Sequence, residues 1–184
     1  MKSLEMKNKN ILLGVSGGIA AYKSCELVRT LVKAGANIDC ILTKAGGQFI
    51  TPLTLQTLSG NPVHTDIFHL TEETDVRHIS LADKADLILV APATANIIAK
   101  VACGLCNDLL TTVICATKAP VLFAPSMNVN MWENPITQDN IEKLKKYGYH
   151  FIEPGEGMLA CGYEGKGRLA EINTIANTAK SILE

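Results

Sequence analysis

The residues best suited to ligand chemistry in this sequence follow an apolar run near its centre. Leu87–Ala91 is uninterruptedly apolar, which is typical of a strand buried on both faces of a parallel sheet. Pro92 cannot donate to a β-ladder, so we expect the strand to end there. Residues 93–96 are small or hydrogen-bonding, and at the carboxyl end of a central strand such residues let a flat ligand approach the backbone. An ordinary strand-to-helix turn would have the same composition, so this pattern alone leaves both interpretations open.

A glycine turn near the N-terminus is the second candidate site. Ser16, Gly17 and Gly18 follow an apolar strand over 10–15, and the helix that comes next ends at Gly35. In such a turn the exposed amides and the positive end of the helix dipole can bind a phosphate group. The spacing matches neither the dinucleotide fingerprint nor the P-loop, so it does not by itself name the ligand.

The second expected strand, Ile38–Thr43, bears on which nucleotide could bind. A dinucleotide fold needs an acidic residue near the end of this strand, where it holds a ribose. Here the strand ends at Thr43 and Lys44, and Asp39 lies too early. The sequence therefore disfavours NAD and favours a mononucleotide.

Three further segments contain residues that could act on a ligand. Ser126–Trp132 holds two methionines, two asparagines and the sole tryptophan, directly after an apolar strand. Methionine-rich loops usually serve packing, but this one is expected beside the 92–96 loop, which favours ligand contact. His78 lies in a helical segment, where a lone histidine is usually a surface or packed residue. Cys161 lies in the glycine-rich segment 155–167, which predicts a mobile loop, either a linker or an active-site lid.

The cysteines give little sign of metal chemistry. Most of the six lie in apolar segments, so we expect them to be reduced, small core residues. Cys103 and Cys106 have the spacing of half a zinc site, but no second pair or neighbouring histidine completes it. We therefore expect no metal.

Composition narrows the class of partner. The chain is 47% hydrophobic and 19% charged with a net charge of -1, which gives no electrostatic reason to expect nucleic acid or an anionic membrane. No apolar run approaches the roughly 20 residues that span a bilayer, and Met1–Asn10 has no signal-peptide core behind it. We expect a cytoplasmic protein with a single domain over residues 1–184, of which residues 1–9 could be disordered.

The elements that must position these residues alternate between strands and helices. Helical periodicity covers the segments between the strands and a closing amphipathic helix near the C-terminus. Apolar runs predict strands over 10–15, 38–43, 87–91 and 120–124, with 149–152 as the final one. This alternation predicts an α/β fold: a Rossmann-like, doubly wound parallel sheet in three layers.

Several of these stretches, taken in order, resemble one family, the flavin-containing cysteine decarboxylases. Each is weak alone, but together they are specific, and the resemblance runs from about Ile11 to the end of the chain. It is closest to the branch that acts in coenzyme A biosynthesis. The matching stretches are Gly17–Lys23, His78–Ile79, Pro92–Asn96, Pro125–Trp132 and Leu159–Gly162.

The resemblance implies an FMN enzyme built from Rossmann-like subunits that assemble as trimers or multiples of trimers. The implied reaction converts 4'-phosphopantothenoylcysteine to 4'-phosphopantetheine by oxidation to a thioaldehyde, loss of CO2 and reduction of the enethiol. Many bacterial relatives carry a fused C-terminal synthetase that makes the substrate. This chain stops before one, so a separate phosphopantothenoylcysteine synthetase is expected in the pathway.

The resemblance also implies roles for individual residues. His78 and Cys161 are the implied catalytic residues, with His78 managing proton transfer and Cys161 supplying a proton to the final reduction from a substrate lid. Asn128 is implied to bind the substrate carboxylate, with Met131 beside it. Lys23 is a candidate for the substrate phosphate, although a lysine in a first helical turn is usually only solvated. The implied flavin-binding residues are Ser16, Gly17, Gly18, Thr43, Ala91, Pro92, Ala93, Thr94, Ala95, Asn96 and Met127.

Other functions remain open beside this one. A peptidyl-cysteine decarboxylase would share His78, Asn128 and the Met-Asn loop, so substrate preference is what distinguishes it. A flavin prenyltransferase of related fold would lack the Leu159–Gly162 segment, which is present here. A regulatory flavoprotein that only binds a protein partner is the alternative from another class, and the retention of His78, Asn128 and Cys161 together argues against it.

Overall fold

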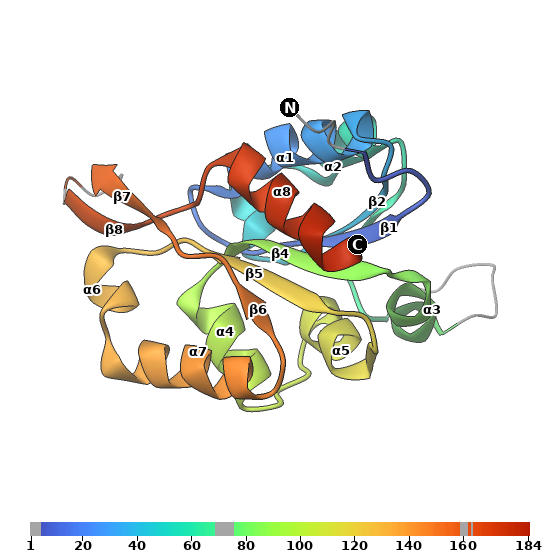
Figure 1. Ribbon diagram of the computed structural model, residues 1–184. Coiled ribbons are helices and arrows are strands. Elements are labelled where there is room, and N and C mark those ends of the chain that lie inside the picture. Colours follow the sequence, from blue (N-terminus) through green and yellow to red (C-terminus); the bar gives the residue numbers. More distant parts are fainter. Residues whose placement is uncertain (1–4, 69–75, 159–161, 163) are drawn as a thin grey trace.

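The molecule is built on one six-stranded parallel sheet, seen in a computed structural model that describes residues 5–68, 76–158, 162 and 164–184. The strand order is β3-β2-β1-β4-β5-β6, and every neighbouring pair is parallel. This is the predicted Rossmann-like, doubly wound arrangement (Figure 1). The strands are β1 (Asn10–Val15), β2 (Asn37–Leu42), β3 (Val63–His64), β4 (Leu87–Ala93), β5 (Val121–Pro125) and β6 (His150–Phe151).

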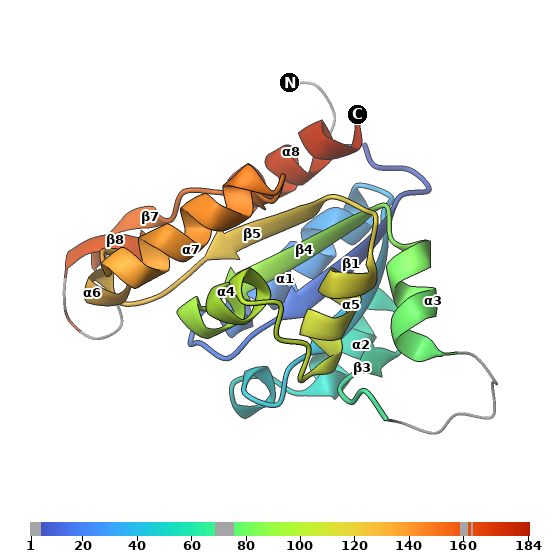
Figure 2. The ribbon, with the colours of Figure 1, turned by 90° about the horizontal axis from the view of Figure 1, so that it is seen from below.

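Helices cover both faces of the sheet and complete the three layers (Figures 1 and 2). The central strands supply side chains to both cores: Leu89 packs into the cluster with α1 and α8, and Val90 into the opposite cluster. The apolar run at the centre of the sequence is therefore a strand buried on both faces, as predicted. On one face lie α1 (Ala21–Lys33), α2 (Pro52–Ser59) and α8 (Ile172–Leu183), and on the other α3 (Arg77–Lys84), α4 (Ala95–Ala102), α5 (Leu109–Ala116) and α7 (Pro135–Lys146).

Strand β4 runs past the proline that was expected to stop it. It continues through Pro92 to Ala93, so the predicted end was two residues short. The ladder to β5 passes from Val90 directly to Ala93, which pairs with Pro125, and its register shifts between them. The N–H that Pro92 lacks is therefore not needed at this point in the ladder. Thr94 follows as the N-cap of α4.

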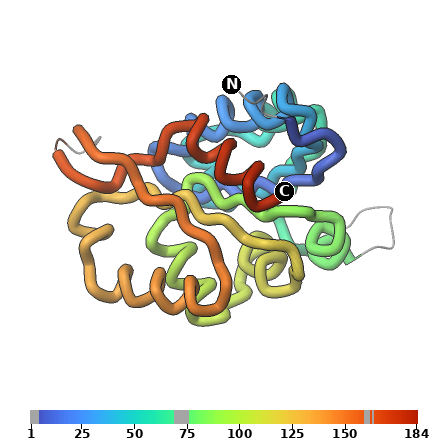
Figure 3. Tube along the Cα trace, viewed as in Figure 1, coloured from blue at the N-terminus to red at the C-terminus, as the bar shows by residue number. Residues whose placement is uncertain are grey.

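An antiparallel hairpin outside the main sheet follows β6, so the strand near residue 150 is not the last one (Figure 3). It consists of β7 (Gly155–Met158) and β8 (Glu164–Arg168) and lies beside the short helix α6 (Val129–Trp132). Its two strands are rich in glycine and lack the alternation of apolar and polar residues that predicts a strand. A Cβ atom on Gly167 would overlap the Met127 carbonyl oxygen, so this glycine permits close backbone packing. The remaining element of the described residues is the 3-10 turn η1 (Gly46–Gln48).

The five described cysteines are free thiols, but they are not all core residues. Cys40 is buried, and burial together with the neighbouring Asp39 raises the pKa of its thiol to about 12. Cys103, Cys106 and Cys115 are exposed, so the expectation of core positions was wrong for these three. They lie after α4 or at the solvent-facing end of α5, where apolar sequence neighbours gave a misleading signal.

Two features are absent from the described part of the chain. Within residues 5–68, 76–158, 162 and 164–184, no helix is long and apolar enough to cross a membrane. Over the same part of the chain, no group of three or more His, Cys, Asp or Glu side chains is placed to hold a metal ion.

Candidate active site

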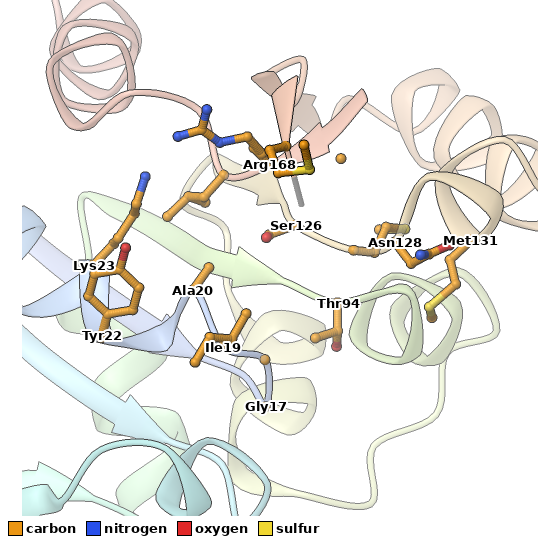
Figure 4. Close-up of a pocket in the computed structure, with 15 residues that line it drawn as sticks. Gly17, Ile19, Ala20, Tyr22, Lys23, Thr94, Ser126, Asn128, Met131 and Arg168 are labelled. Atoms are coloured by element: carbon orange, nitrogen blue, oxygen red, sulfur yellow. The ribbon is translucent and has the colours of Figure 1, made fainter. Parts of the chain in front are cut away.

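The carboxyl ends of β1, β4 and β5 meet at a cavity of about 520 Å³, which we call the first cavity (Figure 4). It lies where the strand order reverses, the usual place for a ligand in an open α/β sheet. Its walls come from residues 17–20, Thr94, the segment 126–128 and the β7–β8 hairpin. Its volume is within the range of about 300–1,000 Å³ that holds small-molecule ligands.

A second cavity of about 740 Å³ lies beside the first and shares Gly17, Thr94 and Met131 with it. The remaining walls of this second cavity come from Ser16, from residues 43–45 and Gln48 after β2, from helix α4, and from the two residues before α5. The two cavities therefore form one continuous candidate site around the glycine turn.

The glycine turn is shaped by the close approach of two loops. A Cβ atom on Gly17 would lie 2.8 Å from the carbonyl carbon of Ala45, so only glycine fits there without displacement. Helix α1 begins at N-cap Ala20 with no side-chain cap and no acidic residue in its first turn. No carboxylate in that first turn competes for the amides at the positive end of the helix, which suits a phosphate group.

Two hydroxyl groups fix the shape of this edge of the sheet. Ser16 is buried, and its Oγ donates to the Pro92 carbonyl oxygen at 2.7 Å and accepts from the Thr94 amide at 3.2 Å. Thr43 Oγ1 donates to the Val15 carbonyl at 3.2 Å and accepts from the Gly46 amide at 3.0 Å. Both side chains hold neighbouring strand ends in position beside the cavities.

An ion pair lines the second cavity. Lys100 Nζ lies 2.8 Å from Asp108 Oδ2, and the two side chains are 20% and 28% exposed. Asp108 also caps α5 by accepting from the Thr111 amide at 2.9 Å. Burial raises the pKa of Asp108, but the hydrogen bonds from Lys100 and Thr111 outweigh that effect and lower it. The carboxylate therefore stays ionised as part of the scaffold.

Asn128 lies at the junction of β5 and α6. It is the N-cap of α6, and its Oδ1 accepts from the Asn130 amide at 2.9 Å, which fixes the orientation of the side chain in the first cavity. A carboxamide held in this way carries donors on nitrogen that suit a carboxylate ligand. Met131 is half exposed and Met127 is buried, and together they make this part of the wall apolar.

The structure brings most of the predicted site residues together. Ala91, Pro92 and Ala93 are instead buried in β4, and Ala95 begins α4, so these four line neither cavity. The residues that line one or both cavities are Ser16, Gly17, Gly18, Lys23, Thr43, Thr94, Asn96, Met127, Asn128 and Met131.

The two predicted catalytic residues stand apart from this group. His78 lies in the first turn of α3 and lines neither cavity. Cys161 lies outside the described residues.

Sequence reasoning missed Arg168, which lines the first cavity from β8. The whole glycine-rich segment was expected to be a loop. The alternation of glycine with charged residues over 164–168 was the signal that could have found this strand. Lys100 and Asp108 in the second cavity were missed because they come from two different helices.

A family model described as Flavoprotein matches residues 1–184. The chain belongs to the flavoprotein family. Among its curated relatives, this flavoprotein is 52% identical over 175 residues to the coenzyme A biosynthesis bifunctional protein CoaBC of Bacillus subtilis (strain 168), covering 95% of this chain and 43% of that protein. The chain thus spans less than half the length of that bifunctional relative. It is 48% identical to the probable phosphopantothenoylcysteine decarboxylase of Streptococcus mutans, covering 91% of this chain and 94% of that protein.

Solved structures agree with the fold of this flavoprotein. A mutant PPC decarboxylase complexed with pantothenoylaminoethenethiol superposes with a TM-score of 0.84 at 32% identity, covering 95% of this chain and 98% of the other. The FMN-dependent cysteine decarboxylase SpaF gives the same TM-score of 0.84 at 28% identity, covering 98% of each chain.

Proposed function

We propose that this protein decarboxylates 4'-phosphopantothenoylcysteine to 4'-phosphopantetheine, as an FMN-dependent carboxy-lyase of coenzyme A biosynthesis. The observation that carries the proposal is the first cavity, which holds Asn128 at the carboxyl end of β5 beside the glycine turn after β1. The similarity over nearly the full length of the Streptococcus mutans protein supports the same activity.

The residues around the glycine turn fit FMN. Gly18 leaves space in front of the amino end of α1, because a Cβ atom there would meet nothing nearer than Thr94 Cγ2 at 3.7 Å. Thr43 and Lys44 follow β2, where a dinucleotide site would need an acid. The adjoining second cavity would hold the flavin ring and is lined by Thr94, Asn96 and Met131. When bound, FMN would supply reversible two-electron chemistry to the cysteinyl C–S unit.

Asn128 and Cys161 have distinct roles in this proposal. Asn128 holds the substrate carboxylate through its amide nitrogen and so fixes the C–C bond that breaks. Cys161 gives a proton to the enethiol during the final reduction, because a thiol with a reference pKa of about 8.5 releases a proton far more readily than a hydroxyl group.

His78 is proposed to act from another copy of the chain. It lines neither cavity of its own chain, whereas four exposed apolar side chains lie around the glycine turn and α2. Exposed apolar side chains of this size on a small protein favour burial against a partner. We propose a trimer or a multiple of trimers, located in the cytoplasm. The four side chains are Ile19, Tyr22, Phe49 and Leu53.

A peptidyl-cysteine decarboxylase is the second candidate, since it would share His78, Asn128 and the Met-Asn loop, and the FMN-dependent cysteine decarboxylase SpaF has the same overall fold at 28% identity. One experiment separates the two activities. The purified protein is incubated with 4'-phosphopantothenoylcysteine and with cysteine-ended peptides, and CO2 release is measured for each. We expect a yellow protein that releases FMN on denaturation and that decarboxylates the phosphorylated substrate. A colourless protein that FMN cannot reconstitute, or turnover of peptides alone, would contradict the proposal.

A further inference from the structure

The first cavity has an unusual charge distribution. Of the described residues that line it, only Lys23 and Arg168 are charged; both are cationic, and the described lining contains no acidic side chain. None of the ion pairs found among the described residues involves either side chain. Two unpaired cations beside a largely apolar surface favour an anionic ligand that would neutralise them.

Arg168 is held over a glycine. A Cβ atom on Gly157 would lie 3.1 Å from Nη1 of Arg168 and 3.6 Å from its Cδ, so glycine leaves the space next to the guanidinium. Gly157 also has a φ of +130°, which disfavours a larger residue there. The sequence of the hairpin therefore provides a place for the Arg168 side chain along β7.

Lys23 enters from the opposite wall. It is half-buried in the first turn of α1, beside the glycine turn. In Figure 4, Lys23 and the guanidinium of Arg168 lie on the side of the cavity away from Met131, with Asn128 on the Met131 side. The cavity thus has a carboxamide toward one end and two cations toward the other.

We infer that Arg168 and Lys23 form a subsite for the terminal phosphate monoester of the substrate. The inference rests on the proposed function, because it assigns the two ends of one substrate to two ends of the first cavity. Asn128 takes the cysteinyl carboxylate, and the phosphate at the far end of the extended molecule meets the cations. A guanidinium binds a phosphate through two parallel hydrogen bonds, which makes Arg168 the main determinant of preference for a phosphorylated substrate.

The flavin also carries a phosphate monoester, so the same cations could meet either phosphate. The glycine turn already offers amide groups to the flavin phosphate at the amino end of α1, beside the second cavity. We therefore assign the two cations to the substrate, and the experiment measures both ligands.

The test uses FMN-loaded Arg168→Ala, with Lys166→Ala as the matched control. Lys166 lies on the same strand but does not line the first cavity. Its Nζ instead lies 2.6 Å from Glu153 Oε2. Calorimetric titration with 4'-phosphopantetheine and with pantetheine gives the affinity for ligands that differ only in the phosphate. We expect Arg168→Ala to weaken the phosphorylated ligand by about 10- to 100-fold and to leave pantetheine unchanged. Arg168→Lys should recover part of the loss, and Lys166→Ala should change neither affinity.

Two other outcomes would overturn the assignment, and a third would contradict only the proposed function. Equal losses of affinity for both ligands would show that Arg168 supports the cavity wall and does not bind the phosphate. A weaker FMN affinity with an unchanged ratio between the two ligands would assign the cations to the flavin phosphate. The wild-type protein could also bind the phosphorylated ligand more tightly than pantetheine and yet release no CO2. That result would support the phosphate subsite and contradict only the proposed function.

Discussion

The two cavities differ in what their charged residues contact. In the first cavity Lys23 and Arg168 have no acidic partner among the described residues, and one wall is a hairpin docked through the Met127 amide, which donates to the Gly167 carbonyl at 2.9 Å. In the second cavity Lys100 pairs with Asp108 at 2.8 Å. The Lys100–Asp108 pair of the second cavity therefore stabilises the protein, whereas the two cations of the first cavity are available to a ligand. Substitutions in the two cavities should separate folding from recognition.

The largest effect is expected where the cavities meet. Gly17→Ala places a Cβ 2.8 Å from the Ala45 carbonyl carbon, and because backbone cannot move aside easily we expect the free energy of unfolding to fall by about 3 kcal/mol. Urea unfolding of the apoprotein measures this change. Gly18→Ala is the matched control, since its Cβ would meet nothing nearer than Thr94 Cγ2 at 3.7 Å. Equal losses in both variants would show that the turn itself, and not its packing, sets stability.

A change in the hairpin should affect the first cavity alone. Gly167→Ala would push β8 away from the Met127 carbonyl oxygen, and overpacking of this kind costs about 1–3 kcal/mol. We expect the affinity for 4'-phosphopantetheine to fall by about 10-fold or more while the affinity for FMN is kept. Gly155→Ala in the same hairpin makes only ordinary contacts, with Arg168 Cβ at 3.9 Å, and serves as the control. Loss of FMN binding in Gly167→Ala would mean that the two cavities are not independent.

The ion pair of the second cavity should matter for stability and little for substrate recognition. Asp108→Ala removes the α5 cap and leaves Lys100 without its partner, so we expect a loss of about 2 kcal/mol in the free energy of unfolding. Asp108→Asn can still cap the helix and should lose less. The ratio of affinities for phosphorylated and unphosphorylated ligand should stay at the wild-type value in both variants, and a changed ratio would contradict the division between the cavities.

The contribution of this carboxylate should also depend on pH. The folded protein lowers the pKa of Asp108, so the folded state binds fewer protons at this group than the unfolded state. Its stabilisation is complete above the unfolded value near 3.8 and is lost as the pH falls through the lower folded value. The difference in unfolding free energy between wild type and Asp108→Asn should therefore be constant from pH 5 to 7 and should shrink below about pH 4. A difference that grows on acidification would exclude this mechanism.

The main sheet could be predicted from the sequence because its central strands are buried on both faces and so read as continuous apolar runs. Strand β1 was predicted with its observed bounds, and β4 was predicted except for its last two residues. The two-residue strand β3 was missed because Val63–His64 is too short to show any period. The hairpin was missed because glycine is depleted in most strands, and here close backbone packing overrides that tendency.

The site could be predicted only where its residues follow a strand end. Ser16, Thr94 and Asn128 are such residues, and the parallel sheet necessarily brings them to one edge. The position of Arg168 depends on how the hairpin folds back onto Met127, a long-range contact that no local pattern records. The relation of His78 to the cavities depends on contacts beyond a single chain in our proposal, so a single sequence contains no geometric signal for it.

The hairpin has a consequence for how this protein could diversify. Strands β7 and β8 form their own sheet, and neither pairs with the six strands whose ends make the glycine turn and the second cavity. Their sequence can therefore vary without shifting the register of the main sheet. Selection for a new substrate could act on a short, separable module, while the cofactor-binding scaffold is inherited unchanged. Exchange of residues 155–168 between relatives should then transfer substrate preference as a unit.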